Sequence, residues 1–319
     1  MPCAGVFDLL QLQRLFSDRL KERVPLARYT TARVGGSADA FISVNSKQEL
    51  KDIVGYLWSL GIPYLIIGGG SNMLISDAGV REVVIYNRAR QVRFDEDNHT
   101  PKVEAESGAK IGLVARQAAA RGLAGLEWAA GIPGTVGGAV VGNAGAHGRD
   151  MAESLFVAEI LHQHKEGDNS QGNLHPMVED WPVHRLEFGY RNSILKRQKG
   201  SMVVLSAEFP LMRSTPEQVR KKIQEFVSFR QRTQPPGASM GSMFKNPTED
   251  SAGRLIEAAG LKGRRIGDAE ISSKHANFFI NHGGASAMDI KQLIDLACSE
   301  VYEKFEVKLE LEIELVGEW

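Results

Sequence analysis

The fold of this chain is best read from the stretch Gly131-Ile132-Pro133-Gly134-Thr135-Val136-Gly137-Gly138-Ala139-Val140-Val141-Gly142-Asn143-Ala144-Gly145-Ala146. Its glycines and alanines offer almost no side chain to fill a core, and an ordered glycine costs conformational entropy without returning packing. A folded run of this kind turns sharply or brings the main chain close to a ligand. Amide groups without a neighbouring Cβ can point together at an anion, so a phosphate-bearing nucleotide or cofactor is the leading interpretation.

A second glycine cluster, Gly68-Gly69-Gly70-Ser71-Asn72, follows the apolar run 62–67, which is typical of a buried strand. A strand followed by a glycine turn is the usual setting of a phosphate cradle. Neither cluster matches G-x-G-x-x-G or G-x-x-x-x-G-K-[ST], so the chain is not an obvious Rossmann or P-loop protein. One cluster alone would more often be a tight turn, whereas two clusters, each beside an apolar strand, favour a ligand.

The composition is that of an ordinary soluble globular protein, with 319 residues, 43% hydrophobic residues, 24% charged residues and a net charge of −1. This length predicts two or three domains. Nothing indicates a nucleic-acid surface, a membrane span or a signal peptide. Cys3 and Cys298 form neither a disulfide framework nor a metal motif, which fits a reducing cytoplasm and predicts no metal site.

Hydrophobic spacing predicts the secondary structure of the first two thirds of the chain. An amphipathic helix is expected over 8–21. A strand over 40–44 is followed by a capping box, Ser46 with Glu49, which opens a helix that Gly61 ends in the left-handed conformation. With the 62–67 strand these elements form a β-α-β unit. Further strands are expected over 83–86, 92–94, 102–105, 155–161 and 202–209, and a helix over 111–121, ended by Gly122.

Two segments between these elements differ in character. Residues 163–180 are polar and predict an exposed excursion. By contrast, Leu186-Glu187-Phe188-Gly189-Tyr190-Arg191-Asn192-Ser193 places aromatic, basic and hydroxyl groups in a short loop. That combination favours a site over a linker.

A new unit is predicted from Thr215-Pro216, where a Thr cap and a Pro at the first helical position open a helix that must end before Pro235. Helices over 252–259 and 287–304 flank a strand over 276–281. The alternating segment 307–315 predicts a strand with one buried face. This pattern assigns at least two of Glu310, Glu312 and Glu314 to a solvated face.

Five motifs in order resemble one family. They are Gly68-Gly-Gly-Ser-Asn72, Gly131-Ile-Pro-Gly-Thr-Val-Gly-Gly138, Gly189-Tyr-Arg-Asn-Ser193, Gly241-Ser-Met-Phe-Lys-Asn-Pro247 and the closing Leu-Glu-Ile-Glu. Each motif alone is weak, but all five in this order resemble the UDP-N-acetylenolpyruvoylglucosamine reductase (MurB) family. The residues by themselves indicate only a soluble, enzyme-like protein with phosphate cradles and a polar cluster.

The resemblance implies an α+β protein, with the FAD-binding fold of the vanillyl-alcohol oxidase type in two parts and a C-terminal α+β substrate-binding domain. The expected domains are 1–82, 83–213 and 214–319, with the last strand returning to the active site. The first glycine loop carries neither His nor Cys, so FAD is expected to bind non-covalently. The residues implied for FAD are Thr31, Arg33, Gly35, Gly68, Gly69, Gly70, Ser71, Asn72, Gly131, Pro133, Gly134, Thr135, Gly137, Gly138 and Asn143.

The resemblance also implies a reaction of peptidoglycan precursor synthesis. NADPH reduces FAD and leaves, and UDP-N-acetylglucosamine enolpyruvate then receives the hydride and becomes UDP-N-acetylmuramate. Such a reduction needs a preorganised group for the developing negative charge and a proton donor. The resemblance assigns Arg191 and Glu312 to the first task and Ser242 to the second, supported by Lys245 or water. The residues implied for holding the substrate are Tyr190, Lys245 and Asn246.

Other expectations follow from the same resemblance. The interval from Ser242 to Glu312 is typical of family members without an extra tyrosine-bearing loop, while 163–180 is longer than the usual pattern. We expect a cytoplasmic monomer or weak oligomer whose partner is the small-molecule substrate, with no nucleic acid and no membrane. Two alternatives stay open: another flavoprotein of this fold that oxidises an alcohol or hydroxy acid, and a nucleotide-binding protein without catalysis.

Overall fold

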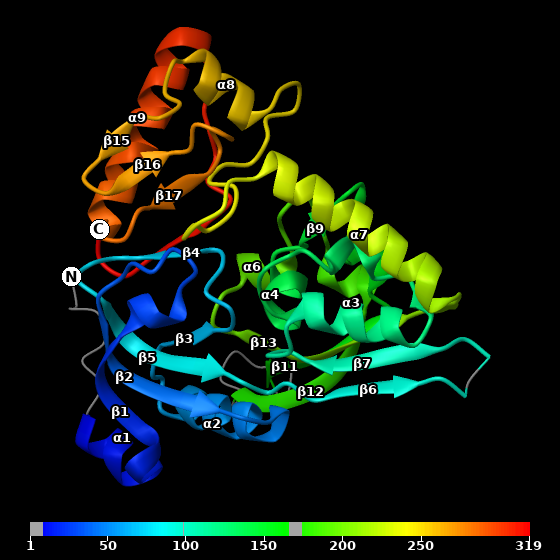
Figure 1. Cartoon of the computed structure of the whole chain (residues 1–319). Helices are drawn as coiled ribbons and strands as arrows, with labels where there is room; N and C mark the ends of the chain where they lie inside the picture. Colours follow the sequence, from blue (N-terminus) through cyan, green and yellow to red (C-terminus); the bar gives the residue numbers. More distant parts are fainter. Residues whose placement is uncertain (1–8, 98, 166–173) are drawn as a thin grey trace. The chain divides into compact units, whose positions relative to one another are not determined.

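The structure, a computed structural model, describes residues 9–97, 99–165 and 174–319 (Figure 1). Cys3 therefore lies outside the described residues. The chain divides into two compact units. Unit 1 comprises Met1–Ile42, Gly69–Val84 and Phe229–Trp319, and unit 2 comprises Ser43–Gly68 and Ile85–Ser228. The division into domains at 1–82, 83–213 and 214–319 stays a prediction.

Unit 2 is built on a five-stranded antiparallel sheet with the order β12-β11-β13-β7-β6. Its strands are β6 (Val92–Asp95), β7 (Lys102–Glu106), β11 (Val157–Lys165), β12 (Leu174–Pro182) and β13 (Met202–Pro210). The predicted strands over 92–94, 102–105, 155–161 and 202–209 are thus confirmed within a few residues. A register shift between Glu159 and Ile160 bends β11 against β13.

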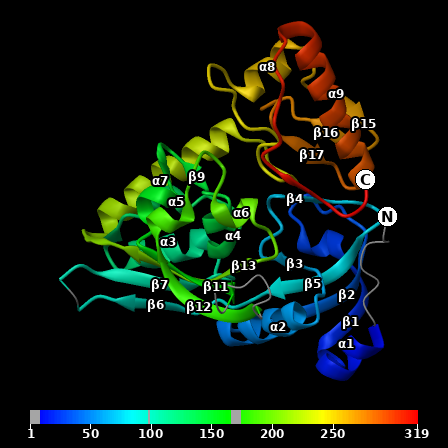
Figure 2. The same ribbon diagram turned by 180° about the vertical axis from the view of Figure 1, so that it is seen from behind.

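Helices cover both faces of this sheet. Figure 1 and Figure 2 show α3 (Ile111–Ala120), α4 (Val136–Val141) and α7 (Pro216–Thr233) on one face, and α2 (Lys47–Ser59) on the other. The core between the sheet and the helices α3, α4 and α7 includes Trp128 and Phe209, at 1% and 0% exposure. The glycine stretch 131–146 therefore packs on a tightly packed core.

Helix α2 begins and ends as its sequence predicts. Ser46 accepts a hydrogen bond from the Glu49 amide at 3.2 Å, and Gly61 has φ +63° just past the helix. The Glu49 carboxylate accepts from the Asn45 amide, 2.9 Å away, rather than from Ser46. The second bond of the predicted capping box therefore comes from the amide of Asn45, one residue before the cap, and the helix still begins after Ser46.

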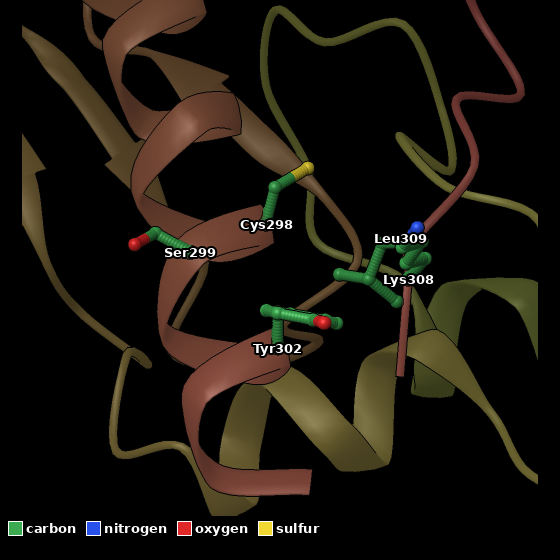
Figure 3. A pocket seen from close by; sticks show the side chains of 5 residues that line it. All are labelled: Cys298, Ser299, Tyr302, Lys308 and Leu309. Carbon is green, nitrogen blue, oxygen red and sulfur yellow. The ribbon is translucent and has the colours of Figure 1, made fainter. Parts of the chain in front are cut away.

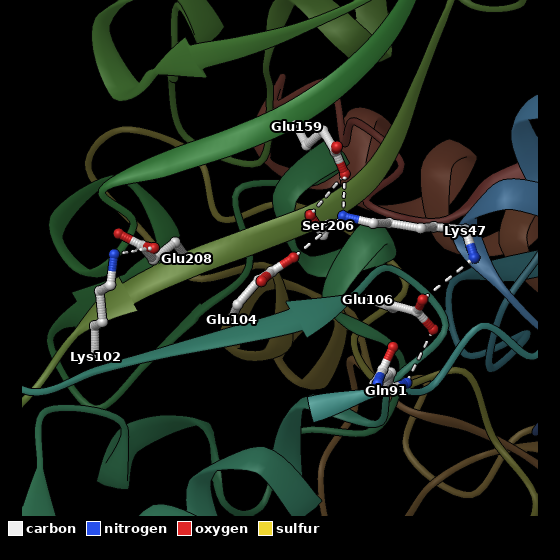
Figure 4. A network of polar contacts seen from close by, with 8 residues as sticks. All are labelled: Lys47, Gln91, Lys102, Glu104, Glu106, Glu159, Ser206 and Glu208. Atoms are coloured by element: carbon white, nitrogen blue, oxygen red, sulfur yellow. Dashed lines mark hydrogen bonds and ion pairs between the residues drawn. The ribbon is translucent and has the colours of Figure 1, made fainter. Parts of the chain in front are cut away.

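Polar contacts hold α2 to the sheet at Lys47 (Figure 4). Its ammonium donates to Glu159 at 2.8 Å and to Glu104 at 3.2 Å, and its amide donates to the buried Glu106 carboxylate at 3.3 Å. Burial lowers the pKa of Lys47, but the bonds to these carboxylates outweigh it, and the pKa is raised. The network therefore anchors the first residue of α2 to β7 and β11 of the sheet.

Two predicted segments differ from what the structure shows. The first helix ends at Phe16 rather than at 21, because Ser17 has φ +44° and Leu20–Pro25 (β1) pairs antiparallel with Ser37–Val44 (β2). The polar stretch 163–180 is not an excursion throughout. Its ends continue β11 and β12, paired from Val157↔Pro182 to Lys165↔Leu174, and residues 166–173 lie outside the described residues. Polar side chains suit an edge strand such as β12, which explains the misassignment.

The remaining elements are short or connect these layers. β2 is followed by α2 and β3, and the sheet order β1-β2-β5-β3 confirms that both strands of the predicted β-α-β unit belong to one sheet. The further bounds are α1 (Leu9–Phe16), β3 (Tyr64–Ile67), β4 (Met73–Ile75), β5 (Val80–Asn87), β8 (Leu123–Ala124), β9 (Gly145–Ala146), β10 (Arg149–Asp150), α5 (Met151–Ser154), α6 (Ile194–Arg197) and β14 (Met212–Arg213).

In unit 1, the antiparallel strands β15 (Arg265–Ile266), β16 (Ala269–Ile271) and β17 (Phe279–Asn281) pack on α9 (Ala287–Phe305), beside α8 (Ala252–Ala258). The predicted helices are confirmed. The predicted strand 276–281 begins only at Phe279, because the chain turns at 275–278, where the Phe278 amide donates to the His275 carbonyl.

The closing segment 307–315 is a strand over only part of its length. Leu311 makes an isolated bridge with Phe244, and β18 (Glu314–Val316) pairs parallel with β4. The alternation of apolar and charged residues did not predict that the pairing partner of the segment changes along its length, from residue 244 to residue 74. A continuous ladder cannot form where the partner changes.

Candidate active site

The two glycine motifs meet in unit 2. A Cβ on Gly68 would lie 2.4 Å from the Thr135 hydroxyl, and a Cβ on Gly137 would lie 2.9 Å from the Ser107 Cβ. Thr135 is buried and caps α4 by accepting from the Gly138 amide at 3.4 Å. The backbone of the first motif therefore lies directly against the cap of the second, with no space for a side chain between them.

In unit 1, the rest of the first glycine motif lies against the segment that carries Thr31. A Cβ on Gly70 would lie 1.9 Å from the Tyr29 carbonyl, and the Thr31 amide donates to the Gly70 carbonyl at 3.0 Å. Gly35, with φ +124°, would place a Cβ 2.9 Å from Ile75. The structure thus brings Thr31 to Gly70 and Gly35 to Ile75, while Arg33 is exposed and has φ +58°.

These residues fit a flavin dinucleotide. Neither 68–72 nor 131–138 carries an acidic side chain that would repel a diphosphate. Glycine keeps the main chain bare, and Gly134 has φ +113°, a conformation that L side chains rarely adopt. Ser71, Asn72 and Thr135 add hydroxyl and amide groups that can donate hydrogen bonds.

Arg191 lies on a tight turn in unit 2. Gly189 and Asn192 exchange backbone hydrogen bonds at 3.0 and 3.1 Å, and Arg191 has φ +54°. Its guanidinium donates to the Gly145 carbonyl at 3.1 Å and lies 5.3 Å from the centre of the Tyr190 ring. The turn therefore presents a cation and an aromatic ring, 55% exposed, beside the glycine stretch.

Two further side chains, Ser193 and Asn143, join this turn to the glycine stretch by hydrogen bonds. Ser193, fully buried, donates to the Val141 carbonyl at 2.7 Å and caps α6 by accepting from the Lys196 amide. Asn143 donates to the Gly189 carbonyl at 3.0 Å. The polar cluster predicted over 186–193 is thus a well-anchored element.

Ser242 and Glu312 come together in unit 1. Ser242 forms an isolated antiparallel β-bridge with Phe278. The carbonyl of the next residue, Met243, accepts a hydrogen bond from the Glu312 amide at 2.8 Å. The Asn72 side chain donates to the Glu312 carbonyl at 3.2 Å. Three motifs that lie far apart in the sequence therefore share one small region of backbone.

Lys245 and Asn246 lie beside them. The Lys245 amide donates to the Glu310 carbonyl at 2.8 Å, and its ammonium lies 3.2 Å from the Glu310 carboxylate. Asn246 accepts from the Ala252 amide at 3.2 Å, at the start of α8. Glu310, with its side chain 75% exposed, belongs to the solvated face as the alternation predicts.

Asn277 is a site-supporting residue that the sequence reading missed. Its side chain, 3% exposed, accepts from the Phe244 amide at 2.9 Å and donates to the Phe244 carbonyl at 2.8 Å. It thereby holds the segment that carries Ser242. The signal was an amide in the otherwise apolar run 276–280, since a buried amide requires polar partners.

His275 supports Asn277 in turn. Its ring Nδ1 accepts from the Asn277 amide at 3.2 Å. Burial lowers the pKa of His275, and the positive charge of Lys262 lowers it further. The neutral ring is the form that can accept this bond.

A shallow depression of about 410 Å³ lies elsewhere in unit 1, between α9 and 308–309 (Figure 3). Cys298, Ser299, Tyr302, Lys308 and Leu309 line it, and none of these is a predicted site residue. Burial raises the pKa of the Cys298 thiol, so the less reactive protonated form prevails near neutral pH.

In 9–97, 99–165 and 174–319 no group of three His, Cys, Asp or Glu side chains could hold a metal ion. Of the helices in those ranges, none combines the length and the apolar character that crossing a bilayer requires.

Comparison with known proteins identifies the family of this chain. Residues 38–161 match the family described as FAD binding domain, and residues 231–316 match the family described as UDP-N-acetylenolpyruvoylglucosamine reductase, C-terminal domain. The UDP-N-acetylenolpyruvoylglucosamine reductase of Chloroflexus aggregans is 42% identical over 300 residues, 93% of this chain and 97% of that protein. The protein of the same name from Bacillus subtilis is 38% identical over 294 residues, 92% of each chain.

A solved structure agrees with these matches. The crystal structure of UDP-N-acetylenolpyruvylglucosamine reductase (MurB) from Thermus caldophilus is similar with a TM-score of 0.75 at 36% identity, covering 93% of this chain and all of that one. The predicted fold class is confirmed as an α+β protein with an FAD-binding domain and a C-terminal α+β domain. The chain is an FAD-dependent oxidoreductase, and it belongs to the UDP-N-acetylenolpyruvoylglucosamine reductase family.

Proposed function

We propose that this protein reduces UDP-N-acetylglucosamine enolpyruvate to UDP-N-acetylmuramate, with NADPH as the hydride donor, in the cytoplasmic synthesis of peptidoglycan precursors. The observation that carries this proposal is the meeting of Ser242 and Glu312 through the hydrogen bond between the Met243 carbonyl and the Glu312 amide. An alcohol oxidase of the same fold has no need to pair a hydroxyl-bearing turn with a C-terminal carboxylate.

Bound FAD supplies two-electron hydride chemistry. The residues that would hold its diphosphate are the glycines, Ser71 and Asn72 of 68–72 and the glycines, Pro133 and Thr135 of 131–138, together with Thr31, Arg33 and Gly35. Binding is non-covalent in this proposal, because 68–72 offers neither His nor Cys for attachment.

Arg191 would stabilise the charge that develops on the substrate. Reduction of the enolpyruvyl group adds a hydride to the vinyl methylene carbon, and electron density moves onto the neighbouring carbon and its carboxylate. A planar guanidinium can bind a carboxylate through two parallel hydrogen bonds, which fixes the plane of the group. Its bond to the Gly145 carbonyl holds it in place before the reaction, as electrostatic stabilisation requires.

Ser242 would complete the reduction by donating a proton to that neighbouring carbon. A serine hydroxyl has a high pKa, so it can act as a general acid only toward a strongly basic centre such as an enolate. Glu312 orients the intermediate in this proposal, and Tyr190, Lys245 and Asn246 hold the substrate. The double bond becomes a single bond, with one hydride and one proton added.

The organisation of the protein is part of the same proposal. Domains at 1–82, 83–213 and 214–319 would divide FAD binding from substrate binding, with the C-terminal strand returning to the active site. The small-molecule substrate is the only partner that the chemistry requires, and a monomer or weak oligomer suffices for it.

The test is NADPH consumption by the purified protein with and without UDP-N-acetylglucosamine enolpyruvate, with the product identified by mass spectrometry. We expect yellow protein that carries FAD, substrate-dependent NADPH oxidation and a product two hydrogens heavier than the substrate. Turnover of an alcohol or hydroxy acid with oxygen, and none with the enolpyruvyl substrate, would instead establish an oxidase of the same fold.

A further inference from the structure

The side chain of Asn143 is fully engaged by the protein. Its amide nitrogen donates to the Gly189 carbonyl at 3.0 Å and to the Asp150 carboxylate at 3.2 Å, and its oxygen accepts from the Ala152 amide at 3.0 Å. Both amide hydrogens are therefore used, and the residue is 4% exposed. A side chain with no donor left cannot also donate to a cofactor, although the family resemblance suggested that role.

The backbone conformation of Asn143, like its side-chain hydrogen bonds, restricts which residues this position accepts. The residue has φ +43°, a left-handed conformation in which Asn is one of the few well-tolerated residues apart from glycine. This conformation turns the chain toward β9, so that Gly145 pairs with Asp150 across the β9–β10 ladder.

Gly189 and Asp150, which accept hydrogen bonds from the Asn143 side chain, both belong to segments that hold Arg191. The Gly189 carbonyl belongs to the turn whose exchanged backbone bonds with Asn192 enclose Arg191. Asp150 is paired with Gly145, whose carbonyl accepts from the guanidinium at 3.1 Å. A Cβ on Gly145 would lie 2.8 Å from the Asp150 Cβ and 3.3 Å from a guanidinium nitrogen, so the three groups are in close contact.

We propose that Asn143 and Asp150 are positioning residues for Arg191, which fix both the backbone that carries the guanidinium and the carbonyl that holds it. This inference rests on the proposed function of Arg191. It assigns to Asn143 a role in the reduction of the substrate in place of a contact with FAD.

The test compares Asn143→Gly and Asn143→Asp with the unaltered holoenzyme. Glycine keeps the left-handed backbone and removes all three side-chain bonds, whereas Asp keeps an acceptor and loses both donors. Because displacement of a catalytic group by about 1 Å lowers a rate by about 100-fold, we expect both variants to slow oxidation of the reduced enzyme by the substrate by about 10- to 100-fold. FAD content and the rate of reduction by NADPH should stay within about two-fold of the unaltered protein.

A double-mutant cycle with Arg191→Ala separates positioning from general damage. If Asn143 acts through Arg191, Asn143→Gly has less than about a two-fold effect on the substrate half-reaction in the Arg191→Ala background. The matched control is Ser46→Ala, which removes a helix cap in the same unit and should leave that half-reaction unchanged while lowering the thermal unfolding temperature. Calorimetric binding of the substrate to the oxidised variants adds a readout that does not depend on turnover.

The outcomes distinguish this inference from the function on which it rests. If Arg191→Ala slows the substrate half-reaction but Asn143→Gly acts equally in both backgrounds, the positioning role is wrong and the function of Arg191 stands. Loss of FAD from Asn143→Gly would also overturn it and restore the cofactor contact. If Arg191→Ala is as fast as the unaltered enzyme, both the role of Arg191 and this inference fail.

Discussion

At the scale of single residues, the proposed proton donor is held by its neighbours rather than by its own side chain. Met243 and Phe244, both fully buried, anchor the segment through bonds with Glu312 and Asn277. Ser242 itself is half-buried. A change of its hydroxyl should therefore leave the local backbone intact, so that an altered rate reports on chemistry.

We expect Ser242→Ala to slow the substrate half-reaction by about 100- to 10,000-fold, the range in which general acids contribute. Reduction by NADPH should be nearly unchanged, because no proton from Ser242 is needed there. Anaerobic rapid mixing measures the two half-reactions separately, and Ser242→Cys, which keeps a proton donor, should recover part of the rate. Equal losses in both half-reactions would instead indicate a folding or FAD-binding defect.

His275 predicts a dependence of stability on pH. Its pKa in the folded protein lies below the ordinary 6.5, because burial and Lys262 disfavour the charged ring, so the unfolded chain binds more protons. Its contribution to the free energy of unfolding is therefore complete above about pH 6.5 and is lost as the pH falls toward the folded pKa.

Urea unfolding at about pH 7.5 and 5.5 should show this loss, and His275→Gln should reduce the difference between the two pH values. The matched control is His184→Gln, at an exposed position. An unaltered difference in His275→Gln would show that other groups cause the pH dependence.

At the scale of elements, the glycine motifs act first as packing surfaces. Gly68 lies against the Thr135 cap of α4, and Gly137 lies against Ser107, which follows β7. Protein atoms already occupy the space that a Cβ would need, so these two glycines shape the cradle through contacts within the protein. The interpretation that they leave the main chain bare for a ligand is compatible with this, but it is not the only reason for glycine.

Gly68→Ala should accordingly destabilise the protein by about 1 to 3 kcal/mol, since Thr135 cannot move away without giving up its cap. FAD content should fall as well, because both motifs form the proposed cradle. Thermal unfolding and flavin absorbance measure the two effects.

Gly55→Ala is the matched control, because the nearest atom to its Cβ, in Pro176, is 3.7 Å away. Alanine in the middle of α2 should stabilise the helix by about 1 kcal/mol without changing FAD content. An unchanged stability in Gly68→Ala would show that Thr135 adapts to the added methyl group.

At the scale of the whole molecule, local patterns predicted the elements well and their partners poorly. The cap at Ser46, the left-handed Gly61 and the helices α8 and α9 depend on neighbours in the sequence, and the structure confirms them. The contacts of 307–315 with 244 and 74 join residues far apart in the chain, and apolar alternation specifies a buried face but not its neighbour.

The candidate site, too, was predicted from the sequence only in part. Motif order indicated Arg191, Ser242 and Glu312, and the structure brings the last two together through the Met243–Glu312 bond. Sequence patterns could not show that Asn143 faces Gly189 and Asp150, because its side-chain partners lie 46 and 7 residues away. Asn277 was missed for the same reason.

The proposed function requires that the enolpyruvyl substrate oxidise the reduced enzyme. The most direct measurement is anaerobic stopped-flow absorbance in the flavin band, with the protein first reduced by NADPH and then mixed with UDP-N-acetylglucosamine enolpyruvate. We expect rapid return of the oxidised flavin absorbance and formation of UDP-N-acetylmuramate. Reduction by NADPH without reoxidation by this substrate would contradict the proposed function.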